Sequence, residues 1–128
     1  MCGLNDLKAE DVMVKKLITV RPNVKIAYAD LLMTRNSIGG LPVVEGERLV
    51  GIITQRDIMY ARTYSIGNLE VKDLMSKKVV TVEPNTKLKE ILRIMLENKI
   101  ERLPVVENGK LVGMVVHNKI LKKIYEAL

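Results

Sequence analysis

The sequence predicts an α+β fold in which one β-α-β-β-α unit occurs twice in tandem. The main observation is an internal repeat: when the chain is shifted by 62 positions, residues 11–60 fall on residues 73–122 without a gap, and 21 of these 50 positions are identical. In addition, short β-branched runs alternate with helix-periodic segments within each copy. We place repeat 1 at residues 7–66 and repeat 2 at residues 67–128. A unit of about 60 residues buries little surface by itself, so we expect the copies to pack face to face with approximate two-fold symmetry.

Each copy begins with a short amphipathic lead-in and an extended segment. In the first copy the lead-in is residues 7–13, and the β-branched run 18–20 is expected to form a strand that Pro22 stops. Asn23 is then expected to cap a helix that runs to about Asn36, because Asn is a favoured N-cap residue. The corresponding segments of the second copy are the lead-in 69–75, the strand 80–82, and a helix from the cap Thr86 to about Asn98.

A hairpin and a final helix complete each copy. In the second copy, strands over 103–106 and 111–116 flank Asn108-Gly109. Asn-Gly between two β-rich runs is a strong hairpin signal. A helix over 118–127 is expected to follow. The equivalent segments of the first copy are the strands 41–44 and 49–53, the turn 45–47 and a helix over 55–65.

The composition favours a compact cytoplasmic protein without a membrane span. Of the 128 residues, 48% are hydrophobic, but there is no Phe and no Trp, so aliphatic side chains and seven Met must fill the core. The longest aliphatic run, Leu111 to Val116, is far shorter than the roughly 20 residues of a membrane helix. Cys2 is the only cysteine, which excludes an intrachain disulfide and favours a reducing cytoplasm.

The charges and residue types argue against several classes of function. The 21 basic and 15 acidic residues give a net charge of +6, but the two signs interleave along the chain. Aromatic platforms for stacking bases are scarce, so we expect a mixed surface rather than a nucleic-acid interface. One His and one Cys cannot form a zinc site. Because His117 has no partner set for nucleophilic catalysis, we expect no enzyme activity.

The ordered motifs of both copies resemble the cystathionine-β-synthase (CBS) domain pair. Each copy carries D-x-M, T-V-x-P, L-P-V-V-E and L-V-G followed by two hydrophobic residues, and the resemblance extends from about Leu7 to Ile124. It implies a stand-alone regulatory module that binds an adenine-containing ligand (AMP, ADP, ATP or S-adenosylmethionine) and requires no cofactor. It also implies a homodimer and a separate protein that the module regulates. The alternatives are a scaffold that only dimerises or holds another protein, and nucleic-acid binding.

The family's ligand signature, G-h-h-[Ser/Thr]-x-x-Asp, is present in the first copy as Gly51-Ile-Ile-Thr54-Gln-Arg-Asp57. By the resemblance, Asp57 accepts the ribose hydroxyls, and Thr54 lies at a helix start, which attracts phosphate. The alternative is a capping box, because Thr54 and Asp57 also have the spacing of that helix-start motif. The second copy has Val116 and Lys119 at these positions. We therefore expect its cleft to bind no ribose-anchored nucleotide.

The resemblance also assigns residues to the adenine and to the phosphates. The adenine is expected against the first strand of repeat 1 and against the residues just before Leu-Pro-Val. The phosphates are expected to meet Arg102 from the other copy, because its forked donors suit phosphate. The alternatives are a plain turn before the strand and, for Arg102, an ion pair with Glu101 or Glu107. The adenine-site residues are Thr19, Val20, Arg21, Ile26, Ile38, Gly39 and Gly40, and the further phosphate candidates are Arg21 and Arg56.

Overall fold

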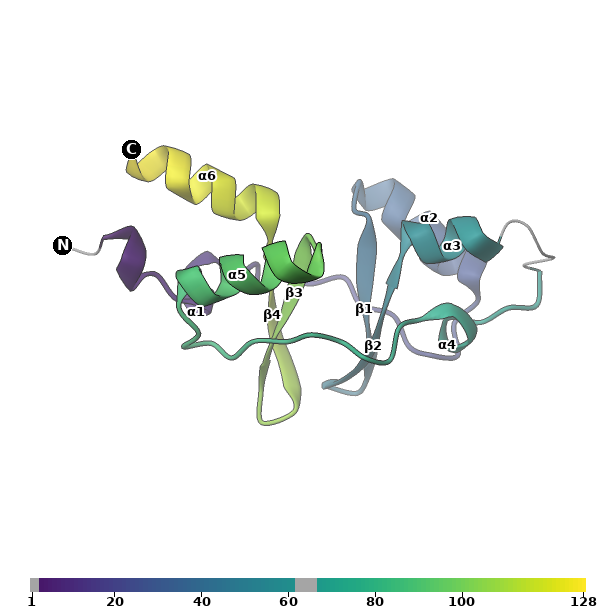
Figure 1. Cartoon of the computed structure of the whole chain (residues 1–128). Helices are drawn as coiled ribbons and strands as arrows, with labels where there is room; N and C mark the ends of the chain where they lie inside the picture. The colour runs from purple at the N-terminus through teal and green to yellow at the C-terminus, as the bar shows by residue number, and fades with distance from the viewer. Residues whose placement is uncertain (1–2, 62–66) are drawn as a thin grey trace. The chain divides into compact units, whose positions relative to one another are not determined.

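The computed structural model describes residues 3–61 and 67–128. The chain divides into two compact units, which we call the central unit (Ile18–Val79) and the terminal unit (Met1–Leu17 with Val80–Leu128). Each unit holds one β-hairpin and the helices that pack on it (Figure 1). The mixture of helices and strands confirms the predicted α+β class.

The central unit is built on the hairpin of the first repeat. Strands β1 (Gly40–Glu45) and β2 (Arg48–Thr54) pair antiparallel, with a register shift between Val43 and Val44. The helices of this unit are α2 (Ile26–Asn36), α3 (Gln55–Ala61) and α4 (Val71–Leu74). Its core consists of the buried side chains Val20, Ile26, Ala29, Met33, Leu41, Val43, Ile53, Ile58 and Val71.

The terminal unit repeats this plan on the second hairpin. Its turn is formed by Asn108 (φ 53°) and Gly109 (φ 80°), as the Asn-Gly signal predicts. The elements of this unit are η1 (Leu4–Asp6), α1 (Ala9–Val12), α5 (Leu88–Asn98), β3 (Arg102–Glu107), β4 (Lys110–Val116) and α6 (His117–Ala127). Its core consists of the buried side chains Ala9, Val12, Val82, Leu88, Ile91, Met95, Leu103, Val105, Val115 and Ile120.

The extended run predicted at the start of each copy pairs at a single residue instead of forming a strand. The Val20 N–H donates to the carbonyl of Pro42 (3.1 Å), and the Val44 N–H donates to the carbonyl of Val20 (2.9 Å). The next bonds of a parallel ladder would require an N–H on Pro42 and on Pro22, which proline lacks. The terminal unit repeats this isolated bridge at Val82 for the same reason. The β-α-β-β-α order therefore holds with its first strand reduced to one bridge.

The long helices α2 and α5 start later than the sequence predicts, because a backbone carbonyl of the lead-in takes the place of a side-chain cap. The Ile26 N–H donates to the carbonyl of Leu69 (3.1 Å), and the equivalent bond of α5 is 2.8 Å long. Neither helix has a side-chain cap. The predicted capping by Asn23 and Thr86 is therefore wrong.

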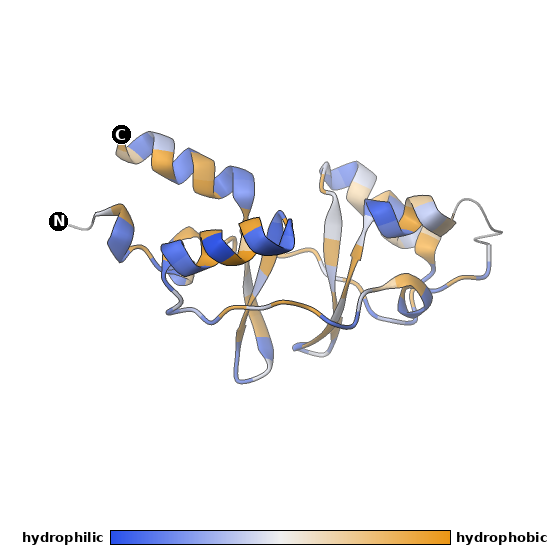
Figure 2. Ribbon diagram, in the orientation of Figure 1, coloured by the Kyte–Doolittle hydropathy of each residue, from blue (hydrophilic) through white to orange (hydrophobic). Residues whose placement is uncertain are grey.

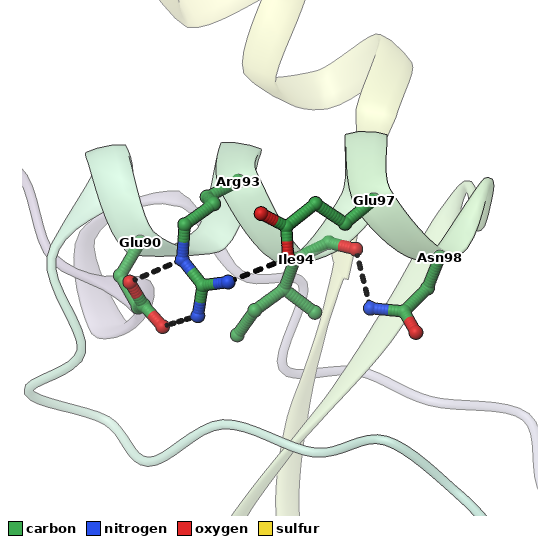
Figure 3. Close-up of polar contacts among 5 residues, drawn as sticks. All are labelled: Glu90, Arg93, Ile94, Glu97 and Asn98. Carbon is green, nitrogen blue, oxygen red and sulfur yellow. Dashed lines mark hydrogen bonds and ion pairs between the residues drawn. The ribbon is translucent and has the colours of Figure 1, made fainter.

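The C-terminal ends of α2 and α5 agree with the prediction. Each helix ends at an Asn (Asn36 or Asn98) whose side-chain amide donates to the carbonyl four residues earlier at 2.8 Å. The next residue is left-handed in both cases, which stops the helix. On the exposed face of α5, Arg93 pairs with Glu90 and Glu97 (Figure 3). The hydrogen bond from Arg93 lowers the pKa of Glu90.

The lead-in of each repeat packs in the unit that holds the hairpin of the other repeat. Helix α1, from repeat 1, belongs to the terminal unit, where Ala9 is fully buried. Helix α4, from repeat 2, belongs to the central unit, where Val71 is fully buried. The repeats and the packed units therefore have different boundaries, and each core contains side chains from both copies.

A methionine after each lead-in helix contacts the hairpin glycine of the L-V-G motif. A Cβ atom on Gly51 would lie 2.6 Å from Met75 Sδ and 3.0 Å from the carbonyl oxygen of Ser76. A Cβ atom on Gly113 would lie 2.9 Å from Met13 Cγ and would also meet Met13 Sδ. Real Cβ atoms do not approach so closely, so only glycine leaves room for this packing. The D-x-M and L-V-G motifs thus form pairs, and each pair joins one repeat to the other.

Several apolar side chains stay exposed on the helices, where hydrophobic and hydrophilic residues occur together (Figure 2). They are Tyr28 and Leu31 on α2, Met59 and Tyr60 on α3, Leu96 on α5, and Leu121 and Tyr125 on α6. Within residues 3–61 and 67–128, no helix has the length and the apolar character needed to cross a membrane.

Candidate ligand-binding site

The signature residues Thr54 and Asp57 meet where β2 ends and α3 begins. The carboxylate oxygen Asp57 Oδ2 accepts hydrogen bonds from the Thr54 N–H (2.8 Å) and from Thr54 Oγ1 (3.0 Å). The Asp57 N–H in turn donates to Thr54 Oγ1 (3.4 Å). These reciprocal bonds are a capping box, with Asp in the place of the more usual Glu. The capping interpretation of the spacing is therefore correct as a description of the local structure.

The same bonds fix the carboxylate and leave one of its oxygens available. Both contacts from Thr54 go to Oδ2, while Oδ1 accepts no hydrogen bond from any residue that the structure describes. Asp57 is half-buried, so the side chain is held in place but still reaches solvent. A carboxylate oxygen in this position can accept a hydroxyl hydrogen from a ligand. Capping and ligand binding are therefore compatible roles for Asp57.

The predicted glycine pair lies next to the backbone of Thr54 and Gln55. Gly40 is opposite Thr54 in the β1–β2 register, and the Gln55 N–H donates to the carbonyl of Gly39 (3.0 Å). Thr54, Asp57, Gly39 and Gly40 thus form one group at the start of α3. The structure brings these four predicted residues together.

The remaining predicted residues of repeat 1 lie on both sides of this group. Val20 is joined to β1 by both of its backbone groups, and its side chain is buried. Its neighbours Thr19 and Arg21 are exposed. The Ile26 side chain is fully buried in the core, so it presents no accessible surface to a ligand. Ile38 is half-buried at the end of α2, and Arg56 is exposed on α3.

Arg102 belongs to the terminal unit, where it opens β3 opposite Val116 and is half-buried. The alternative ion pair with Glu101 or Glu107 does not form between these described side chains. The phosphate contact that the resemblance implies for Arg102 stays a prediction.

The terminal unit has the same backbone frame without the polar signature. The His117 N–H donates to the carbonyl of Glu101 (2.9 Å), as Gln55 does to Gly39. Helix α6 nevertheless forms with Val116 as an N-cap that has no side-chain hydrogen bond. The fold therefore does not depend on a capping box at this helix start.

The sequence alone did not reveal which backbone groups support the segment after Arg21. The Lys72 N–H donates to the carbonyl of Pro22 (2.8 Å), and the Val71 N–H donates to the carbonyl of Val24 (2.8 Å). Helix α4, which comes from the other repeat, thus holds the loop next to the predicted adenine site. These are backbone bonds, so no residue type in the sequence indicates them.

A pocket of about 360 Å³ lies elsewhere, in the terminal unit. Its lining includes Glu10, Glu83 and Glu107 and none of the signature residues. In the described part of the chain, no group of three or more His, Cys, Asp or Glu side chains is placed to hold a metal ion.

Comparison with known proteins identifies the family. The CBS domain model matches residues 9–64 and again residues 71–126. The CBS domain-containing protein YhcV of Bacillus subtilis is 37% identical over 108 residues, which cover 83% of this chain and 77% of YhcV. The crystal structure of CBSX2 in complex with AMP superposes with a TM-score of 0.85 at 28% identity and covers 93% of this chain and 96% of CBSX2. The chain therefore belongs to the CBS domain family and is a tandem CBS pair.

Similar segments also occur within larger enzymes. The inosine-5'-monophosphate dehydrogenase of Korarchaeum cryptofilum is 44% identical over 109 residues, or 84% of this chain. The chain spans only 22% of the length of that dehydrogenase. The relationship therefore extends to the CBS pair and not to the enzyme as a whole.

Proposed function

We propose that this chain is a regulatory module that binds one adenine-containing ligand (AMP, ADP, ATP or S-adenosylmethionine) in the central unit. The observation that carries the proposal is the Asp57 carboxylate, which Thr54 fixes through one oxygen while the other oxygen is left to accept a ribose hydroxyl. The AMP complex of CBSX2, a protein with the same fold, supports the choice of ligand class.

The terminal unit supplies an internal comparison. Lys119 stands at the position of Asp57, and Val116 stands at the position of Thr54. A ribose at that position would lose its carboxylate acceptor and would face a cation instead. The proposal therefore assigns the ribose-anchored ligand to the central unit alone, with Thr19, Arg21 and Ile38 as the accessible residues around the base and phosphates.

A thermal-shift panel with AMP, ADP, ATP and S-adenosylmethionine tests the proposal. A ligand at 100 times its Kd stabilises the folded state by about 2.7 kcal/mol, which raises the Tm of a domain of this size by several degrees. We expect at least one of these ligands to produce that shift, and guanosine and cytidine nucleotides at equal concentration to produce less. If none of the adenine ligands moves the Tm, the nucleotide proposal fails.

The second candidate function is a scaffold that only forms dimers or holds another protein, and the exposed helix faces favour it. Tyr28 and Tyr60 are 51% and 72% exposed, and Tyr125 is 79% exposed. Large aromatic side chains of this kind are enriched in protein interfaces. We propose a homodimer in either case, with cytoplasmic residence and no catalytic role. Sedimentation showing only monomer at tens of micromolar would contradict the dimer, and silence of the ligand panel together with a dimer would favour the scaffold.

A further inference from the structure

We propose that Met13 and Met75 form an oxidation-sensitive latch between the two repeats. When a peroxide converts their thioethers to sulfoxides, each lead-in loosens from the unit that it completes. This inference goes beyond the proposed function, and its central test needs no ligand.

The contact between each methionine and its glycine is tight. The sulfur of Met75 lies so close to Gly51 that a Cβ there would be 2.6 Å away, and the backbone oxygen of Ser76 closes the same space. Met13 packs against Gly113 in the same way, with its Cγ at 2.9 Å from the Cβ position. A sulfoxide adds a polar oxygen atom to the thioether, and such a group disrupts apolar packing.

Met13 and Met75 combine tight packing with partial exposure of the residue. Met13 and Met75 are half-buried. Met59 is 66% exposed on α3 and is not part of either core cluster. The other methionines in the described part of the chain are the buried Met33, Met95 and Met114. A peroxide should therefore reach Met59 first, Met13 and Met75 next, and the buried methionines last.

Each methionine of the latch lies next to a pair of backbone hydrogen bonds that join the lead-in to a hairpin strand. Next to Met13, Val14 exchanges two backbone hydrogen bonds with Met114 of β4 (2.8 and 3.0 Å). Next to Met75, Ser76 makes the equivalent pair of bonds with Ile52 of β2 (3.0 and 2.9 Å). A methionine that no longer fits against its glycine weakens these bonds and the burial of the lead-in helix.

The chemistry is a two-electron oxygen transfer. Hydrogen peroxide delivers one oxygen atom to Sδ and leaves as water, so the sulfur is oxidised and the peroxide is reduced. Methionine sulfoxide reductases reverse the reaction, and one enzyme acts on each sulfoxide epimer. The latch can therefore be reset without new protein synthesis.

The test is a peroxide time course on the full-length protein, with peptide mass spectrometry to locate the added oxygen and a Tm measurement at each point. We expect oxidation of Met59 to leave the Tm unchanged, and oxidation of Met13 and Met75 to lower it by several degrees. Treatment with both sulfoxide reductases should restore the Tm. A Met59→Leu variant is the matched control and should behave like the wild type.

The double variant M13L/M75L should keep its Tm under peroxide, since Leu has a similar volume and no oxidisable sulfur. If this variant does not fold, the wild-type time course with reductase rescue decides the question. The proposal is overturned if Met13 and Met75 are oxidised without a change in Tm, if the Tm falls while only Met59 is oxidised, or if the buried methionines react together with them.

Discussion

Replacement of Asp57 by Ala separates the two roles that the structure gives to this carboxylate. The change removes the acceptor of the Thr54 N–H and Thr54 Oγ1 bonds, at 2.8 and 3.0 Å. Loss of a helix cap costs about 1 kcal/mol of unfolding free energy. The change also removes the oxygen that is proposed to accept a ribose hydroxyl. A hydrogen bond to a charged group contributes about 1.5–3 kcal/mol, so the Kd for the nucleotide should rise about ten- to 150-fold.

The assay is isothermal titration of each variant with the adenine ligand that gives the largest thermal shift, together with a Tm measured without ligand. Asp57→Asn should give an intermediate Kd, because the amide keeps an acceptor but loses the charge. Asp11→Ala is the matched control: Asp11 accepts a hydrogen bond from the Lys8 N–H (2.8 Å) in the equivalent capping position of α1. It should lower the Tm and leave the Kd unchanged. If Asp57→Ala behaves like Asp11→Ala in both measurements, Asp57 is only a cap and the proposed site is wrong.

Three further predictions concern packing, the second repeat and the surface. Gly51→Ala should lower the unfolding free energy by about 1–3 kcal/mol in chemical denaturation, because its Cβ meets Met75 Sδ. A G51A/M75A double variant should lose less than the sum of its two single variants, and simple additivity would contradict the contact. Lys119→Ala should leave the nucleotide Kd unchanged, and a clear weakening would place the ligand in the terminal unit as well. Arg93→Ala should lower the Tm slightly at pH 7, and by less at an acidic pH at which Glu90 is protonated, because the lowered pKa of Glu90 adds stability only while that carboxylate is charged. An equal effect at both pH values would rule out this ion pair as the cause.

Periodicity and turn chemistry were sufficient to predict most of the fold. The hairpin turn at Asn108-Gly109 is encoded by two residues that tolerate positive φ. The ends of α2 and α5 are likewise encoded locally, by Asn36 and Asn98. The starts of these helices could not be predicted, because their first N–H groups bond to backbone carbonyls of distant lead-in residues.

The exchange of lead-ins also lies beyond sequence reasoning, and for a different reason. Met13 and Met75 occur in the same D-x-M motif, and Gly51 and Gly113 occur in the same L-V-G motif. A repeat so similar cannot show which methionine packs on which glycine. Only the path of the chain decides it, and each methionine packs on the glycine of the other repeat.

The sequence indicated candidate residues for the site but not their geometry. The spacing of Thr54 and Asp57 indicated both a capping box and a ribose anchor, and the sequence alone could not choose between them. The structure shows that the box uses only Asp57 Oδ2. Ile26 was predicted near the adenine, but its side chain is fully buried. The family motif does not indicate which of its residues are buried.

The most direct test of the proposed function is the stoichiometry of nucleotide binding by the wild-type protein. Calorimetric titration with AMP, ADP and ATP should give one site per chain for the nucleotide that binds, since Asp57 has no counterpart at Lys119. Two equivalent sites per chain, or no heat with any adenine ligand including S-adenosylmethionine, would contradict the assignment of a single ribose-anchored site to the central unit.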